Sequence, residues 1–314
     1  MMKKTLFLAV AVCLVLSCVP LAGAQTSSPA PGTPPKVITI GREEVKVGKG
    51  AAHEKFETNF VRASARAKWP THYLAMSALS GPSEAWYLTG YDSFAAWEQD
   101  REATEKATAF SAELDQLAEK DAEFLTNGRT IVAFFRDDLS YNPNTMDVPK
   151  ARYMRVITYR VRPGHEGDFV EAAKTIRAAY EKTEVKVPWA VYQVTAGAPG
   201  PTFLIFLAMK SLQESDEGIA RGKTIQAALG EENGKKLDKL ASESFINIES
   251  NLFNFSPKMS YVSPEWVAAN PEFWSPKAEM ASRAVPAAGR KAAARTKKEG
   301  ALTPAGKKEE PPKQ

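Results

Sequence analysis

Two segments of the chain share a pattern of strands, turns and helix starts, and this internal repeat constrains the fold more than any other feature. Residues 69–98 align without a gap on residues 187–216, so that Ser93 falls on Ser211. Each segment reads as an apolar strand, a Gly/Pro turn, a second apolar strand and a serine suited to start a helix. Because two copies of a half-buried unit can cover each other's apolar faces, the repeat predicts an α+β protein built from two similar units.

The first unit, residues 36–142, has the periodicity of a β-α-β-β-α-β order. Its second helical stretch starts at Ser93 and is longer than an ordinary helix, so we expect a break within it. Asn127 and Gly128 are typical of a helix stop and are expected to end it. The predicted strands are 37–47, 72–79, 85–91 and 130–135, and the predicted helices are 53–68 and 93–125.

The second unit, residues 150–262, repeats this order. Its first helix presents an apolar face between residues 169 and 180. Its second helical region opens at Ser211 and is expected to be interrupted at three glycines, Gly218, Gly222 and Gly230. The predicted strands are 152–161, 189–195, 202–209 and 245–255.

The element order and the step from third strand to second helix resemble the dimeric α/β-barrel superfamily, in particular its antibiotic-biosynthesis-monooxygenase-like and NIPSNAP-like members. That step reads Tyr91-Asp92-Ser93-Phe94-Ala95-Ala96-Trp97-Glu98 in the first unit and Met209-Lys210-Ser211-Leu212 in the second. The resemblance covers residues 36–262. It implies two ferredoxin-like repeats whose antiparallel sheets close face to face into a barrel within one chain, with helices outside. It also implies a ligand pocket between sheet and helices, in a superfamily of oxygenases, haem enzymes and proteins without known activity.

The first residues have the pattern of a secretory signal. Residues 1–24 combine two lysines, a short apolar run and a small-residue cleavage site, and residues 25–35 read as a flexible linker. Both cysteines, Cys13 and Cys18, lie in the signal, so the mature chain is expected to lack thiol chemistry. We therefore expect export to the periplasm or secretion into the medium, with a lipoprotein anchored at Cys18 as the alternative.

The last residues carry the basic charge of the chain. Residues 263–282 are rich in Pro and Trp and read as an extension lying over the body, whereas residues 283–314 have the composition of a disordered tail. The tail has nine Lys/Arg and three Glu, although the whole chain carries a net charge of only +4. A nucleic-acid partner is therefore not expected, and the tail is instead a candidate for association with the anionic cell envelope.

Aromatic side chains crowd the first unit, and they are the main candidates for a ligand pocket. Arg155 is a further candidate, because an arginine among apolar strand residues can bind an anion if it faces inward. The pocket candidates are Trp69, Tyr73, Trp86, Tyr91, Arg155 and Trp189.

Histidines give weaker signals. His72, close to Trp69 and Tyr73, is a weak candidate for a catalytic base or a haem ligand. His53 and His165 lie near helix starts and are expected to be solvated. Because no histidine recurs at a metal-ligand spacing, the sequence predicts no metal site, and no resident cofactor is expected.

Two functional hypotheses remain open. The first is an exported protein that binds a small apolar or aromatic ligand in a barrel cleft. The second is a monooxygenase-like oxidoreductase that works without a cofactor or with haem, carried by His72 and nearby aromatic residues. Whether the chain is an enzyme is left open. The assembly expected is a monomer with an intrachain pseudo-dimer, or a higher oligomer.

Overall fold

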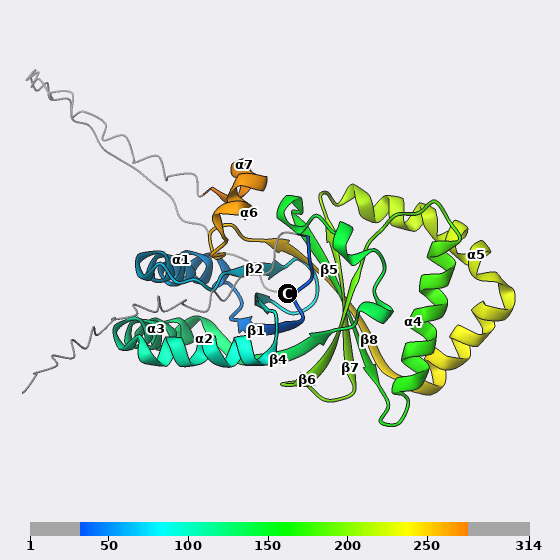
Figure 1. The fold of residues 1–314 in the computed structure, drawn as a ribbon, viewed down its shortest axis with the longest axis horizontal. Helices are drawn as coiled ribbons and strands as arrows, with labels where there is room; N and C mark the ends of the chain where they lie inside the picture. The colour runs from blue at the N-terminus through cyan, green and yellow to red at the C-terminus, as the bar shows by residue number, and fades with distance from the viewer. Residues whose placement is uncertain (1–31, 276–314) are drawn as a thin grey trace, which may run out of the picture. The chain divides into compact units, whose positions relative to one another are not determined.

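Eight antiparallel strands close into a barrel in the computed structural model, which describes residues 32–275 (Figure 1). Strands and helices follow one another as β-α-β-β-α-α-β and then β-α-β-β-α-β. Residues 36–142 are called the first half below and residues 150–262 the second half. The strands are β1 (Val37–Val45), β2 (Tyr73–Ala78), β3 (Glu84–Tyr91), β4 (Leu125–Phe135), β5 (Tyr153–Val161), β6 (Ala190–Ala196), β7 (Thr202–Met209) and β8 (Phe245–Phe255).

The strand order shows how the two halves meet. Around the barrel the order is β1-β3-β2-β8-β5-β7-β6-β4, so each half supplies four neighbouring strands. The halves join along two seams, where β2 pairs with β8 and β4 pairs with β6. Because every strand has two neighbours, the barrel has no free sheet edge. The predicted α+β barrel with antiparallel strands and outer helices is confirmed at this level.

Strand alternation divides the side chains between the barrel interior and its outer face. Ile38 and Ile40 of β1 point inward, where they join apolar side chains from both halves. Trp86 is 1% exposed and packs against Phe253 of β8 with ring centroids 4.8 Å apart. This shared interior is the largest apolar core of the described chain, and its removal from water drives the closure of the barrel.

Helices cover the outer face of the barrel. Figure 1 shows one group of helices beside the first-half strands and another group beside the second-half strands. The first group supplies the walls of the site described below. The helices are α1 (Gly50–Ala67), α2 (Phe94–Lys106), α3 (Thr108–Asp121), α4 (Glu166–Glu181) and α5 (Gln213–Ser244), followed by the short α6 (Pro264–Ala269) and α7 (Pro271–Trp274).

The long helical stretch of the first half starts and breaks as predicted. Ser93 is the N-cap of α2, and its hydroxyl accepts a hydrogen bond of 3.1 Å from the backbone N–H of Ala96. The break falls at Ala107, whose non-helical backbone (φ −83°, ψ 64°) separates α2 from α3. Residues of both helices line one cavity on the outer face of the first-half strands: Asp100 and Thr104 of α2, and Phe110 and Leu114 of α3.

Two local predictions are wrong. Asn127 and Gly128 do not precede the last strand but belong to β4, where they pair with Glu44 and Glu43 of β1. The ladder hydrogen bonds of this long pairing outweigh the turn preference of the two residues. The three glycines expected to interrupt α5 also differ in effect, because only Gly230 leaves the helical conformation (φ 80°, ψ 161°). A single glycine in a helix is a modest cost that neighbouring turns can absorb.

The ends of the chain are described only in part. The predicted signal at residues 1–24, most of the linker at 25–35 and the basic tail at 283–314 lie outside the described residues, as does the last part of the 263–282 extension. Within the extension, Trp274 is 2% exposed, and its indole Nε1 donates a hydrogen bond of 2.6 Å to the carbonyl of Pro149. Across residues 32–275, no helix combines the length and apolar character needed to cross a membrane.

Candidate functional site

A cavity of about 340 Å³ lies between the outer face of the first-half strands and helices α1, α2 and α3. We call it the helix-side cavity. Its volume falls within the range of about 300–1,000 Å³ that is usual for small-molecule sites. Aromatic rings form much of its wall, and a glycine on β1 forms part of its floor. These lining residues include Gly41, Trp69, Tyr73, Tyr87, Tyr91 and Phe110.

The strand register explains why this space is open in the first half. Val37 pairs with Tyr91 in the first half as Tyr153 pairs with Met209 in the second. By the same count along β1 and β5, Gly41 corresponds to Ile157 and Glu43 to Tyr159. A glycine therefore occupies the place of a branched apolar side chain, and a carboxylate occupies the place of a ring.

The corresponding space of the second half is filled by rings. Phe169 of α4 stacks on Phe203 of β7 with centroids 3.9 Å apart, and Tyr159 packs against Phe169 at 5.3 Å. Trp189 lies in the same apolar cluster, against Tyr141 at 4.9 Å. In the second half, packed rings therefore close the layer between strands and helices that holds the cavity in the first half.

Buried hydroxyl groups give the helix-side cavity its polar character. The Tyr73 hydroxyl is buried and has no hydrogen-bond partner among the described residues. Burial, together with the nearby Glu57 carboxylate, raises the pKa of Tyr73, which keeps this hydroxyl a donor at neutral pH. Elsewhere in the wall, Asp100 accepts hydrogen bonds from Thr71 Oγ1 (2.5 Å) and the Tyr91 hydroxyl (2.9 Å). The buried hydroxyl of Tyr87, which also lines this cavity, likewise has no hydrogen-bond partner among the described residues, so Tyr73 and Tyr87 are the two tyrosines in this wall that a ligand could satisfy.

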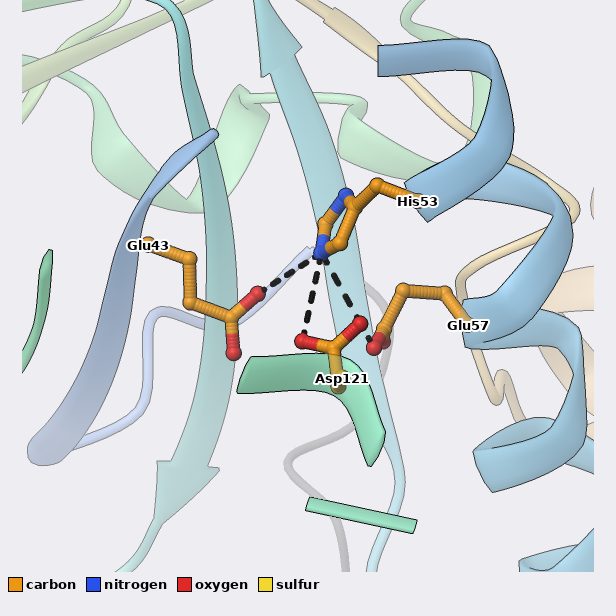
Figure 2. A group of neighbouring side chains, drawn as sticks. All are labelled: Glu43, His53, Glu57 and Asp121. Carbon is orange, nitrogen blue, oxygen red and sulfur yellow. Dashed lines mark hydrogen bonds and ion pairs between the residues drawn. The ribbon is translucent and has the colours of Figure 1, made fainter. Parts of the chain in front are cut away.

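At one side of this cavity a histidine meets three carboxylates (Figure 2). The Nε2 atom of His53 lies 3.0 Å from Glu43 Oε2, 3.5 Å from Asp121 Oδ2 and 3.9 Å from Glu57 Oε1. One ligand atom from each of the four residues lies within 4.8 Å of every other. We call these four residues the His53 cluster.

Local structure brings the four side chains together from three elements. Glu43 follows the alternation of β1 onto the outer face, since Ile38 and Ile40 face inward. His53 and Glu57 are four residues apart on α1 and therefore share one helix face. Asp121 is the last residue of α3, which packs beside α1.

The cluster is buried and holds more acids than bases. The side chains of His53, Glu57 and Asp121 are 2%, 6% and 4% exposed, and that of Glu43 is 26% exposed. Among residues 32–275, His53 is the only basic side chain that forms an ion pair with any of these carboxylates. Arg42, the basic neighbour of Glu43 in sequence, instead binds Glu84 Oε1 at 2.7 Å.

This buried, acidic environment raises the pKa values of two residues of the cluster, His53 and Glu57. Burial alone lowers the pKa of His53, but the Asp121 and Glu43 carboxylates outweigh it and raise that pKa to about 10. Burial, with the repulsion of Glu43 and Asp121, raises the pKa of Glu57 to about 8. In the absence of a cation, protons therefore have to offset the charge of this buried group.

The sequence prediction for His53 was wrong, because this residue is buried rather than solvated. A search for histidines at a repeated spacing gives no signal for a group of one histidine and three carboxylates. One local signal existed: His53 and Glu57 at helical spacing, beside the apolar stripe that includes Phe56 and Phe60. The contributions of Glu43 and Asp121 depend on tertiary packing and have no local signature.

The predicted pocket residues separate into groups in the structure. Trp69, Tyr73 and Tyr91 line the helix-side cavity. Trp86 instead belongs to the barrel interior. Arg155 points away from the interior and donates a hydrogen bond of 3.2 Å to Ser215 Oγ on α5.

His72 lies at another cavity. This second space, about 150 Å³, is at one end of the barrel interior and is lined mainly by apolar side chains such as Leu88 and Phe206. The His72 ring stacks on Tyr261 with centroids 4.7 Å apart, and burial lowers its pKa. A cavity of this size suits a single aromatic ring, whereas a porphyrin is several times larger. The residues around His72 therefore do not fit a haem group.

Comparison with known proteins supports the fold. The crystal structure of an anthrone oxidase-like protein is similar, with a TM-score of 0.51 and 12% identity over 74% of this chain and 97% of that one. A mutant chlorite dismutase from Candidatus Nitrospira defluvii is also similar, with a TM-score of 0.43 and 10% identity over 72% and 93% of the two chains. No protein-family model and no curated protein sequence matches the chain. The chain thus shares its fold, a closed antiparallel barrel with helices outside, with the anthrone oxidase-like protein.

Proposed function

We propose that this protein binds a small aromatic molecule bearing a hydroxyl or carbonyl oxygen in the helix-side cavity. The observation that carries the proposal is a cavity of about 340 Å³ with aromatic walls and the unpaired, buried hydroxyl of Tyr73. Aromatic walls favour a flat apolar ligand, and a buried donor without a partner favours one with an acceptor oxygen. The packed second half supports this choice, because the same layer there is closed by Phe169 and Phe203.

The proposal is tested with 1-naphthol and naphthalene, which differ by one hydroxyl group. We expect the full chain to bind 1-naphthol with a micromolar dissociation constant in a calorimetric titration, and naphthalene more weakly. In the Tyr73→Phe variant the ring remains but the donor is lost. A hydrogen bond contributes about 0.5–1.5 kcal/mol, so affinity for 1-naphthol should fall about 2- to 13-fold while affinity for naphthalene is unchanged.

A matched control is available at another buried tyrosine. The Tyr192 hydroxyl already donates a hydrogen bond of 3.0 Å to the carbonyl of Pro35, and Tyr192 does not line the helix-side cavity. Tyr192→Phe should therefore leave the affinities for both compounds unchanged. The absence of 1-naphthol binding to the wild-type chain, or an equal loss for both compounds in Tyr73→Phe, would contradict the proposal.

A second candidate function is oxidation of the bound aromatic molecule by dioxygen, without haem. The fold shared with an anthrone oxidase-like protein favours it, although a likeness at 12% identity concerns the fold alone. Anthrone is therefore the probe: the full chain should accelerate oxygen uptake in its presence. Unchanged uptake would leave the protein as a binding protein.

The finer classification and the cellular setting are also proposals. We infer that the halves are tandem ferredoxin-like repeats of the monooxygenase-like or NIPSNAP-like type, because both carry the strand pairing that places Tyr91 and Met209 at equivalent positions. We further infer export through residues 1–24, which places the ligand among envelope or extracellular compounds. Mass measurement of the mature chain distinguishes cleavage after Ala24 from lipidation at Cys18.

A further inference from the structure

We propose that the His53 cluster is a binding site for a single divalent transition-metal ion, with Glu43, His53, Glu57 and Asp121 as ligands (Figure 2). This inference goes beyond the proposed function, because the cluster would hold a cation whether or not an aromatic molecule occupies the helix-side cavity. It rests on three observations: the spacing of the ligand atoms, the buried excess of carboxylates, and an unpaired oxygen of Asp121.

The spacing of the ligand atoms suits direct coordination. Nitrogen and oxygen ligands bind Zn²⁺ at about 2.0–2.2 Å, so ligand atoms around a tetrahedral ion lie about 3.4 Å apart. From His53 Nε2 the three carboxylate oxygens lie at 3.0, 3.5 and 3.9 Å. In Figure 2 all three carboxylates gather at the Nε2 edge of the imidazole. Small side-chain adjustments would therefore be enough to place an ion among them.

The buried negative charge of the cluster also favours the binding of a cation. Three carboxylates and one imidazole lie together, and three of these four side chains are no more than 6% exposed. Burying uncompensated carboxylates is costly, and buried acidic groups are therefore paired, protonated or bound to a metal. No lysine or arginine among the described residues forms an ion pair with these three carboxylates. Their negative charge must therefore be neutralised by a metal ion or by protons.

Asp121 supplies an independent indication. Its Oδ1 atom is buried and has no hydrogen-bond partner among the described residues, although the side chain is only 4% exposed. An unsatisfied buried carboxylate oxygen is rare in folded proteins and is expected where an ion completes the site. Its position at the end of α3 places it opposite His53 and Glu57 of α1.

The ligand types indicate which cations fit. Imidazole favours transition metals such as Zn²⁺ over Mg²⁺ and Ca²⁺, whereas the carboxylates also suit Mn²⁺. The site therefore should bind Zn²⁺ and Mn²⁺ more tightly than Mg²⁺. Its place beside the helix-side cavity, which Glu43 and Glu57 also line, puts the ion next to any bound ligand.

The test is a calorimetric titration of the chelator-treated full chain with ZnCl₂ and, separately, MnCl₂. We expect one ion per chain, and thermal unfolding should shift upward by about 5–10 °C at a hundredfold excess over the dissociation constant. Losing an outer contact to a metal ligand costs about 10- to 100-fold in affinity, so Asp121→Asn and Glu57→Gln should each weaken Zn²⁺ binding at least about 100-fold.

A matched control lies in the second half. His165 Nδ1 is 2.7 Å from Asp168 Oδ2, but this pair is half-exposed and has no further carboxylate. Asp168→Asn should therefore leave the stoichiometry and affinity for Zn²⁺ unchanged. If either buried variant fails to fold, as judged by its circular dichroism, Glu43→Gln replaces it, because this side chain is the most exposed of the four.

Two results would overturn the inference. One is the absence of saturable one-to-one binding by the wild-type chain, which would mean that protons alone hold the cluster together. The other is binding that survives Asp121→Asn and Glu57→Gln or that Asp168→Asn removes equally. A chain that binds Zn²⁺ but not 1-naphthol keeps the metal site and loses the proposed aromatic ligand, so the two failures are distinguishable.

Discussion

We expect the Gly41→Val variant to lose binding of both 1-naphthol and naphthalene by at least about 10-fold. Gly41 lies on β1 and forms part of the floor of the helix-side cavity. A Cβ atom at this position would lie 3.7 Å from Tyr87 Cβ, which is an ordinary contact, so the strand can accept it. The two further methyl groups of valine would then occupy space that the ligand needs. A calorimetric titration of the purified variant gives both affinities.

The fold should survive this substitution, because valine favours strands more than glycine does. Gly128→Val is the matched control: Gly128 lies on the neighbouring strand β4, where an added Cβ would meet only Arg42 O at 4.0 Å. It does not line the cavity, so ligand affinity should be unchanged. Full affinity in Gly41→Val, or an equal loss in both variants, would place the ligand elsewhere.

The second large effect concerns closure of the barrel. We expect Gly197→Ala to lower the free energy of unfolding by about 3 kcal/mol or more. Gly197 directly follows β6, has φ +85°, and sits so close to β4 that an added Cβ would lie 1.9 Å from Thr130 O. This contact is with backbone at the β4–β6 seam, where neither strand can move without disturbing the pairing of the two halves. Urea unfolding followed by circular dichroism measures the change.

A variant at Gly164 distinguishes the cost of a positive φ from the cost of the steric clash with β4. Gly164 has a similar φ of +87°, but no atom lies within 4 Å of an added Cβ. Gly164→Ala should therefore show the backbone cost alone, about 1–2 kcal/mol. If Gly197→Ala is no more destabilised than Gly164→Ala, the close approach at the seam does not limit stability.

The barrel could be predicted because its determinants are periodic and local. Alternation along β3 puts Trp86 and Leu88 on one face and Tyr87 on the other, and Trp86 and Leu88 both pack in the barrel interior. Ser93 as a cap and the break at Ala107 follow from helix-start chemistry and helix length. Each of these signals lies within a few residues of the structure that it determines.

The site could be predicted only in outline. The aromatic enrichment of the first half indicates which half holds the pocket. The volume of the pocket depends on Gly41, which occupies the position that Ile157 has in the second half. The His53 cluster joins residues as far apart as Glu43 and Asp121, so its assembly depends on how α3 packs beside α1. Sequence periodicity assigns faces, but it does not determine which buried faces meet.

The measurement that tests the central claim most directly is a crystal structure of the full chain soaked with 1-naphthol. We predict density for the fused rings in the helix-side cavity, with the naphthol oxygen within hydrogen-bond distance of the Tyr73 hydroxyl. Density only in the smaller cavity at the end of the barrel, near Leu88 and Phe206, would contradict the claim. So would a helix-side cavity that stays free of the compound at saturating concentration.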